Sequence, residues 1–194
     1  MKESAIFRRN IKMDDIKDTT DQKLVKLALA NKQEFLALMQ KYEKPLFYYI
    51  KRISGFSKED AEDVLQDTFI NIYKNLNAYD DNLKFSSWAY RIAHNQTISE
   101  FRKRKTRIHY FYEEKDLINL ADNLDNVDSK NILHLRADIE STLAKIPDKY
   151  REVLVLKFIE EKDYKEISDI LKKPIGTVGT LINRAKKKFQ KEFK

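Results

Sequence analysis

A group of small and polar side chains near the C-terminal end of the chain has the types and spacing needed to recognise DNA bases. Hydroxyl, amide, amine and guanidinium groups exchange hydrogen bonds with the base edges that the major groove exposes. The group consists of Gly176, Thr177, Gly179, Thr180, Asn183, Arg184 and Lys187. The chemistry expected here is recognition through hydrogen bonds.

Two helices with a tight turn between them must position these side chains. In the first helix, apolar spacing is carried by Tyr164, Ile167, Ile170 and Leu171. Pro174 is expected to end this helix, and Thr177 to help cap the next one. The core stripe of the second helix consists of Val178, Leu181, Ile182 and Ala185. The pattern predicts a helix-turn-helix over residues 163–188, and an ordinary helical hairpin with a solvated basic end is the alternative.

Composition favours an all-α protein of two small helical domains. The chain has 194 residues, with three glycines and three prolines, which leaves few tight turns. It contains no cysteine, so disulfides, thiolate zinc sites and cysteine nucleophiles are excluded. No apolar run approaches the ~20 residues of a membrane span, and the charged N-terminus lacks the apolar core of a secretion signal. A cytoplasmic protein with no membrane insertion is therefore expected.

The charge is distributed in blocks along the chain. The net charge is +7 and the pI is near 9.3, which favours an acidic partner. Residues 58–67 and 113–128 are acidic, whereas residues 102–107 and 172–194 are basic. Two basic blocks separated by an acidic stretch predict two nucleic-acid contacts joined by a connector.

Three segments with apolar residues precede the first basic block. Residues 22–40 predict one helix or two short ones, and Pro45 begins another apolar stretch that stops at Gly55. In residues 59–77, with Ser57 as the expected cap, a core face is formed by Ala61, Val64, Leu65, Phe69, Ile72 and Leu76.

A second stripe lies beside this core face. It consists of Asp63, Gln66, Asp67 and Ile70, at the spacing of one helix surface. Three polar groups and one exposed isoleucine suit a docking face for a basic partner. A simply solvated helix face is the alternative.

Aromatic and cationic side chains alternate between Tyr79 and Arg107. Aromatic and amide groups beside cations suit unstacked single-stranded bases, and stacking contributes ~1 to 3 kcal/mol per base. The single tryptophan, Trp88, is either such a stacking platform or core packing. His94 is expected to be a surface residue, and no histidine has partners at a spacing that predicts a catalytic triad. No paired-carboxylate, zinc-protease or phosphate-loop motif is present, so the sequence gives no indication of an enzyme, a cofactor or a metal site.

Four segments in this order resemble the group 4, or extracytoplasmic-function (ECF), sigma factors of RNA polymerase. They are DAEDVLQDTFINIYKNL at 60–76, KFSSWAYRIAHNQTISEFRKRK at 84–105, LAKIPDKYREVLVLKFIEEKDYKEISDIL at 143–171 and IGTVGTLINRAKKKF at 175–189. The resemblance implies an N-terminal extension (1–21), region 2 (22–106), an acidic flexible linker toward the polymerase cleft (107–137) and region 4 (138–194).

The resemblance also implies partners and roles for individual residues. The surface for the β′ clamp helices of core RNA polymerase would consist of Asp60, Asp63, Gln66, Asp67 and Ile70. Contacts with the opened −10 promoter element would come from Tyr79, Asn82, Lys84, Trp88, Arg91, Asn95, Arg102 and Arg104. The −35 element would be contacted by Tyr164, Lys165, Ile175, Gly176, Thr177, Thr180, Asn183, Arg184 and Lys187. Further implied partners are the β flap of the polymerase and an anti-sigma factor, and the polymerase would perform the chemistry.

The chain departs from the family pattern in three places. Gly179 and Leu181 stand where the family commonly has lysine or arginine, and Ser99 stands where it frequently has an acid. Direct recognition of −35 bases is therefore expected to be weaker, or replaced by recognition of DNA shape.

Two other classes of protein fit parts of the sequence. One is a conventional helix-turn-helix regulator that binds duplex DNA without polymerase, and the other is a helical interaction protein with basic ends. Neither of them needs both the docking stripe and the aromatic helix of residues 60–105.

Overall fold

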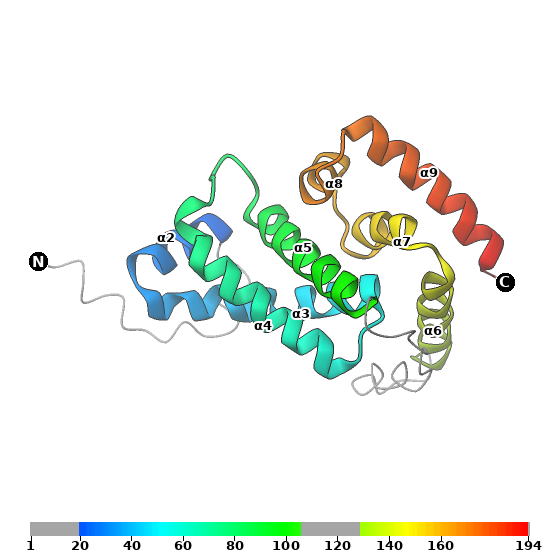
Figure 1. The fold of residues 1–194 in the computed structure, drawn as a ribbon, viewed down its shortest axis with the longest axis horizontal. Helices are drawn as coiled ribbons and strands as arrows, with labels where there is room; N and C mark the ends of the chain where they lie inside the picture. Colours follow the sequence, from blue (N-terminus) through cyan, green and yellow to red (C-terminus); the bar gives the residue numbers. More distant parts are fainter. Residues whose placement is uncertain (1–19, 106–128, 194) are drawn as a thin grey trace, which may run out of the picture.

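The computed structural model describes residues 20–105 and 129–193, and this part of the chain is helical without any strand (Figure 1). The prediction of an all-α fold is thus confirmed. The longer helices are α2 (Asp21–Ala30), α3 (Phe35–Ser54), α4 (Lys58–Asn75), α5 (Phe85–Lys105), α6 (Ser129–Lys145), α7 (Asp148–Leu154), α8 (Tyr164–Leu171) and α9 (Ile175–Glu192). Three short turns are η1 (Lys32–Glu34), η2 (Leu76–Ala78) and the π-helical η4 (Val155–Ile159). None of the helices in the described ranges is long and apolar enough to cross a membrane.

The chain from α2 to α3 breaks at Asn31 and stays helical through Pro45. Residues 22–40 form two helices, because Asn31 is extended and its side chain accepts a hydrogen bond from the Gln33 backbone N–H at 3.1 Å. Pro45, where the apolar stretch of the sequence begins, lies inside α3. Proline removes one helical hydrogen bond, and α3 nevertheless continues through it to the buried Leu46, which is 0% exposed. Gly55 ends α3 in the left-handed conformation, with φ of 71°.

Helix α4 has the predicted cap and the predicted core face. The Ser57 hydroxyl accepts a hydrogen bond from the Asp60 backbone N–H at 3.2 Å, as the sequence indicates. The predicted core positions, Ala61, Val64, Leu65, Phe69, Ile72 and Leu76, are all buried. The opposite surface of α4 is therefore free for other contacts.

The helix-turn-helix is formed by α8 and α9. A reciprocal capping box begins α8: Asp163 accepts from the Glu166 backbone N–H, and Glu166 accepts from that of Asp163. Helix α8 ends at Leu171, before Pro174, because Lys172 takes the left-handed conformation with φ of 52°. The expected Thr177 cap was wrong, since Pro174 is the cap residue of α9 and Thr177 already lies in its first turn.

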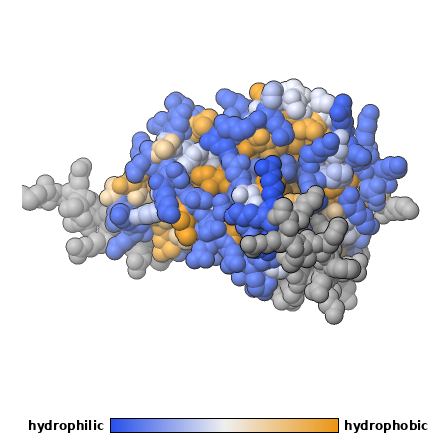
Figure 2. All heavy atoms as spheres, in the orientation of Figure 1, coloured by the Kyte–Doolittle hydropathy of each residue, from blue (hydrophilic) through white to orange (hydrophobic). Residues whose placement is uncertain are grey.

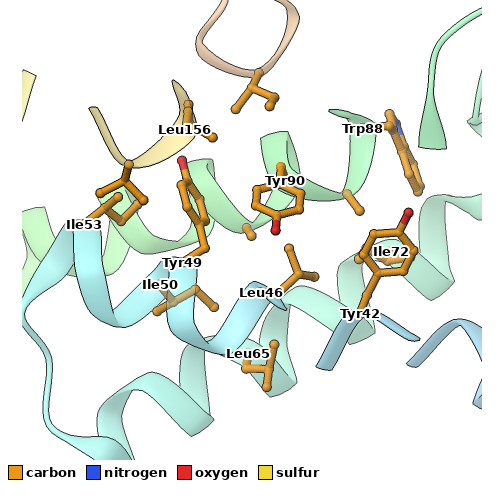
Figure 3. Close-up of a cluster of buried hydrophobic side chains, with 14 of the residues drawn as sticks. Tyr42, Leu46, Tyr49, Ile50, Ile53, Leu65, Ile72, Trp88, Tyr90 and Leu156 are labelled. Carbon is orange, nitrogen blue, oxygen red and sulfur yellow. The ribbon is translucent and has the colours of Figure 1, made fainter. Parts of the chain in front are cut away.

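The N-terminal half (α2–α5) and the C-terminal half (α6–α9) share one buried core. Figure 3 shows Tyr49 of α3, Tyr90 of α5 and Leu156 of η4 close together, and all three side chains are at most 3% exposed. Arg151, which is 4% exposed, donates a hydrogen bond across the halves to the Ile53 carbonyl at 3.2 Å. Helix α6 begins at residue 129, so the last nine residues of the predicted 107–137 linker are helical, while residues 107–128 of that linker lie outside the described residues.

The Ser57 cap provides a test of the fold. Ser57→Ala removes the side-chain acceptor of the Asp60 N–H, and we expect the free energy of unfolding to fall by about 1 kcal/mol. Urea unfolding followed by circular dichroism measures this change. The control is Ser99→Ala, which alters an exposed serine inside α5; equal stability of the two variants would contradict the capping role.

Candidate nucleic-acid interface

The predicted docking stripe lies on the open surface of α4. Asp63, Gln66, Asp67 and Ile70 are all exposed, and Ile70 keeps 42% of its side chain in solvent. The Gln96 amide of α5 donates a hydrogen bond to the Asp67 carboxylate at 3.1 Å, which holds one end of the stripe. The structure therefore brings the four residues together as one accessible surface.

Asp60 differs from the other members of the predicted docking set. Its carboxylate is half-buried and forms an ion pair with Arg104, whose guanidinium also hydrogen-bonds Glu100 at 2.9 Å and lies over the Phe56 ring at 5.0 Å. Arg104 donates one hydrogen bond to Asp60 and another to Glu100, and each bond lowers the pKa of the carboxylate that accepts it. In this structure Asp60 and Arg104 join α4 to α5, and the contacts predicted for them with polymerase and DNA remain predictions.

The loop between α4 and α5 is held by its own hydrogen bonds. The Tyr79 hydroxyl donates to the Leu83 carbonyl, and Asp80 accepts from the backbone and side-chain amides of Asn82 at 3.0 and 2.8 Å. The Tyr79 ring lies 5.4 Å from the ring of Trp88. Trp88 is only 8% exposed, so in this structure it packs in the core, and its role as a stacking platform stays a prediction.

The remaining predicted strand contacts lie on α5 or directly before it. At roughly 100° per residue, Arg91, Asn95 and Arg102 project within a narrow sector of the helix, and Lys84 precedes its first residue, Phe85. Lys84, Asn95 and Arg102 are exposed, and Arg91 is half-buried. The predicted strand face is therefore present as a basic and polar stripe next to the Tyr79 loop.

His94 is not the surface residue that the sequence suggested. It is half-buried, and its Nδ1 lies 3.0 Å from the Tyr49 hydroxyl of α3. Burial, together with the nearby Lys173, lowers the pKa of His94 to about 4. The neutral ring therefore belongs to the packing of α5 against α3, and its position four residues after the buried Tyr90 is the only sequence signal for it.

The predicted −35 face of α9 is open. Its core stripe, Val178, Ile182 and Ala185, is buried, while Leu181 is half-buried. The exposed positions include Ile175, Gly176, Thr177, Thr180, Asn183, Arg184 and Lys187. Thr180 donates its hydroxyl proton to the Gly176 carbonyl at 3.0 Å, which fixes that side chain against the helix.

Helix α8 adds two exposed groups to this face. Lys165 is exposed, and Tyr164 keeps 40% of its side chain in solvent. The Lys157 amine lies 5.4 Å above the Tyr164 ring. The predicted −35 residues therefore form one continuous surface across α8 and α9.

Two features of the C-terminal half were not predicted from the sequence. The first is an apolar groove of about 460 Å³ lined by Ile139, Leu143, Leu154, Phe158, Ile159, Lys186, Phe189, Gln190 and Phe193. Figure 2 shows apolar surface in the region of α7 and α9. The second is Glu152 of α7, a buried carboxylate whose pKa is raised by desolvation to about 7.

Across the described ranges, acidic and histidine side chains do not gather into a group that could hold a metal ion.

Comparisons with known proteins place two segments of this chain in known families. Residues 38–107 match the family model of sigma-70 region 2, and residues 136–189 match that of sigma-70 region 4. The chain is 36% identical over 167 residues to the ECF RNA polymerase sigma factor SigW of Bacillus subtilis, covering 82% of this chain and 89% of that protein. It is 25% identical over 182 residues to the ECF RNA polymerase sigma-E factor of Haemophilus influenzae, covering 90% of this chain and 95% of that protein.

Solved structures share the same fold. CnrH in complex with the cytosolic domain of CnrY has a TM-score of 0.65 at 24% identity, with 88% of this chain and 94% of that chain covered. The sigma factor RpoE in complex with the anti-sigma factor NepR, from Bartonella quintana, has a TM-score of 0.59 at 20% identity, with 83% of this chain and 94% of that chain covered.

The fold and the two family matches define a sigma-type transcription initiation factor. The chain belongs to the ECF group of the sigma-70 family of RNA polymerase sigma factors. It binds polymerase for promoter-directed initiation and is not itself an enzyme, and a conventional helix-turn-helix regulator is not favoured.

The raised pKa of the buried Glu152 carboxyl predicts how the stability of the protein depends on pH. Because its pKa is raised to about 7, its stabilising contribution is complete below the ordinary value of 4.5 and is lost as the pH rises through 7. Glu152→Gln cannot ionise, so at about pH 8 we expect it to raise the free energy of unfolding by up to roughly 3 kcal/mol.

Thermal unfolding at pH 8 and at pH 4.5 measures the difference between wild type and variant. Other titrating groups, such as His94, are shared by both proteins and cancel in this difference. Glu161→Gln, at an exposed carboxylate nearby, is the matched control. A Glu152→Gln effect that is the same at both pH values would contradict the raised pKa.

Proposed function

We propose that this sigma factor docks on the β′ clamp helices of core RNA polymerase through Asp63, Gln66, Asp67 and Ile70 of α4. The observation that carries the proposal is that the four side chains form one exposed surface on a helix whose other side is fully packed. A solvated helix face gains nothing from an isoleucine with 42% of its surface in water. Carboxylates around such an apolar centre suit a partner surface with basic and apolar groups.

Next to this surface, α5 and the Tyr79 loop would engage the non-template strand of the −10 element. A flipped base would lie at the loop from Tyr79 to Lys84, and Asn95 would face the same strand. Arg91 and Arg102 would contact phosphates, since a guanidinium pairs well with phosphate oxygens. The basic and polar stripe along α5 supports this assignment.

The exposed face of α8 and α9 would contact the −35 element. Thr177, Thr180, Asn183 and Arg184 offer donors and acceptors to base edges, while Lys165 and Lys187 suit phosphates. Gly179 has no side chain to contribute, and Leu181 is half-buried among apolar neighbours. These two positions support a weaker direct recognition of bases at −35, with DNA shape supplying part of the specificity.

Other parts of the proposal concern boundaries and partners. Region 2 would span residues 22–106 and region 4 residues 138–194, with the β flap as a second polymerase contact. The CnrH and RpoE structures are complexes with other proteins, and the partner of RpoE is described as an anti-sigma factor. By analogy, an anti-sigma factor would regulate this chain, and the protein would act in the cytoplasm where polymerase works.

Run-off transcription tests the function as a whole. Core RNA polymerase transcribes fragmented genomic DNA of the source organism with and without the purified chain. Discrete new transcripts that share motifs near −35 and −10 are expected. Tight binding to duplex DNA without polymerase, and no new transcripts, would instead favour a conventional regulator.

The docking stripe predicts a loss of polymerase affinity in one double variant. Asp63→Arg with Gln66→Ala reverses one charge and removes one amide, so we expect the dissociation constant for core polymerase to rise at least about tenfold, or roughly 1.4 kcal/mol. Fluorescence anisotropy of the labelled chain measures this constant. Glu43→Arg, an exposed charge reversal on α3, is the control and should bind normally. Unchanged affinity of the double variant would disprove the docking role.

The −35 face predicts a separation of promoter use from polymerase binding. Asn183→Ala with Arg184→Ala removes groups that face solvent and leaves the core stripe of α9 intact. We expect transcript levels to fall about tenfold or more, since each good base contact contributes ~1 to 3 kcal/mol, while polymerase affinity stays unchanged. Lys191→Ala, which removes one positive charge near the exposed end of α9, is the control. Transcript levels equal to those of wild type would contradict the assignment.

A further inference from the structure

Two large apolar side chains are exposed on the helix-turn-helix. Ile175, the first residue of α9, is 52% exposed, and Tyr164, the first residue of α8, is 40% exposed. Neither belongs to the buried core or to the half-buried side chains that pack against it. Both lie on the surface proposed for the −35 element, where hydrogen bonding alone gives an isoleucine no role.

A bare stretch of the α9 backbone joins these two side chains. A Cβ atom built at Gly179 would lie 3.6 Å from Cε1 of Tyr164, so the edge of that ring lies beside a position without a side chain. Ile175 is four residues before Gly179 and therefore lies one turn away on the same side of α9. In Figure 1, α8 lies beside the first turns of α9. Ile175, Gly179 and Tyr164 thus form one surface, which we call the apolar patch.

The fold does not require either glycine of α9. Gly176 and Gly179 are both helical, and neither has a positive φ. A Cβ atom at Gly176 would meet nothing within 4 Å, and one at Gly179 would make an ordinary contact. Glycine destabilises a helix relative to alanine, but it lets a ligand approach the backbone closely. The two glycines therefore keep Ile175 and Tyr164 open to a large ligand surface.

The charge around the apolar patch indicates the kind of ligand. Helix α9 has five basic residues and no acidic residue before Glu192, its last residue. The Lys157 amine lies 5.4 Å from the centre of the Tyr164 ring, and the neighbouring Lys165 is exposed. The carboxylate of Asp163 is engaged in the capping box of α8. Duplex DNA fits these surroundings, because it is a polyanion whose major groove also exposes an apolar group, the C5-methyl of thymine.

We propose that the apolar patch recognises thymine methyl groups in the major groove of the −35 element. This inference rests on the proposed use of α8 and α9 at −35, and it adds the base that the apolar residues select. Ile175 and the edge of the Tyr164 ring would contact the methyl group, since apolar side chains are its usual partners. Cytosine offers an amino group and no methyl group at this edge, so it would lose the contact.

Asn183 extends this recognition along the same side of α9. It lies four residues after Gly179, and its side chain is exposed. The amide of asparagine can donate a hydrogen bond to N7 of adenine and accept one from the N6 amino group. Adenine pairs with thymine, so the methyl contact and the amide contact both favour A·T pairs where the first turns of α9 meet the −35 element.

Deoxyuridine provides a direct test, because it lacks the methyl group of thymine and keeps its hydrogen bonds. A promoter found by run-off transcription is prepared with thymine, with deoxyuridine in the −35 element, or with deoxyuridine in the spacer alone. Core polymerase with the wild-type chain transcribes the three templates. We expect about fourfold less transcript from the −35 deoxyuridine template, the effect of removing one methyl group from an apolar contact. The spacer template should match the thymine template.

Two double variants test whether the apolar patch causes this effect. Ile175→Ala with Tyr164→Ala removes both apolar groups, and we expect equal transcript from the thymine and −35 deoxyuridine templates. Ile175→Val with Tyr164→Phe retains apolar contact and should keep most of the fourfold ratio. Asn183→Ala is the control, since it should lower transcript from both templates and keep the ratio. Circular dichroism reports the helix content; if the alanine pair unfolds, Ile175→Ala alone, at an exposed side chain, should reduce the ratio below about twofold.

Several outcomes would overturn methyl recognition. Equal transcript from the thymine and −35 deoxyuridine templates with the wild-type chain would do so, and so would a −35 element made only of G·C pairs. A fourfold ratio that persists in the alanine pair would assign the effect to DNA shape. Equal loss on both templates, together with weaker polymerase affinity, would make the apolar patch a protein-docking surface.

A scrambled −35 element separates this inference from the proposed −35 contact. If the scrambled promoter is transcribed as well as the intact one, the proposed −35 contact itself fails. If transcription needs the intact element but does not respond to deoxyuridine, only methyl recognition fails.

Discussion

The contact between Tyr49, Tyr90 and Leu156 is the interaction on which the arrangement of this sigma factor depends. Tyr49 and Tyr90 come from the N-terminal half, and Leu156 comes from the π-helical turn of the C-terminal half, yet their side chains lie in one core (Figure 3). The tyrosine rings lie 5.0 Å apart, and each hydroxyl finds a partner, His94 or Glu160. Apolar burial thus draws the halves together, and polar groups at its edge fix their orientation.

Helix α5 shows how one element serves several partners. One side packs in the region 2 core through Phe85, Ala89 and Ala93, and another contacts the C-terminal half through Tyr90. A third side carries the exposed Asn95 and the predicted DNA contacts. A helix with contacts all around has little apolar contrast between its faces, which is why periodicity alone is a weak guide to its role.

The helices and their cores followed from the sequence wherever local physics decided them. The core face of α4, the Ser57 cap and the buried stripe of α9 were predicted because apolar spacing and a short polar side chain act locally. Nothing in the sequence indicates that α3 continues through Pro45, because proline lacks the N–H of a helical hydrogen bond. The burial of His94 and Glu152 was also missed, since their neighbours come from segments far away in the chain. Among the predicted site residues, the α4 stripe and the α8–α9 set are exposed and their roles stay predictions, whereas the pairing of Asp60 with Arg104 had no local signal.

Gly179 has a consequence for how this protein can change over time. A Cβ atom built at this position would meet only the edge of the Tyr164 ring, at 3.6 Å, which is an ordinary contact distance. The backbone therefore does not require glycine, and replacement by a residue with better helix propensity would stabilise α9 by up to about 1 kcal/mol. A single substitution at this site can add a side chain beside Tyr164 while stabilising the helix that carries it. Gly179 is accordingly a position where this chain can gain a side chain without a compensating change elsewhere in the fold.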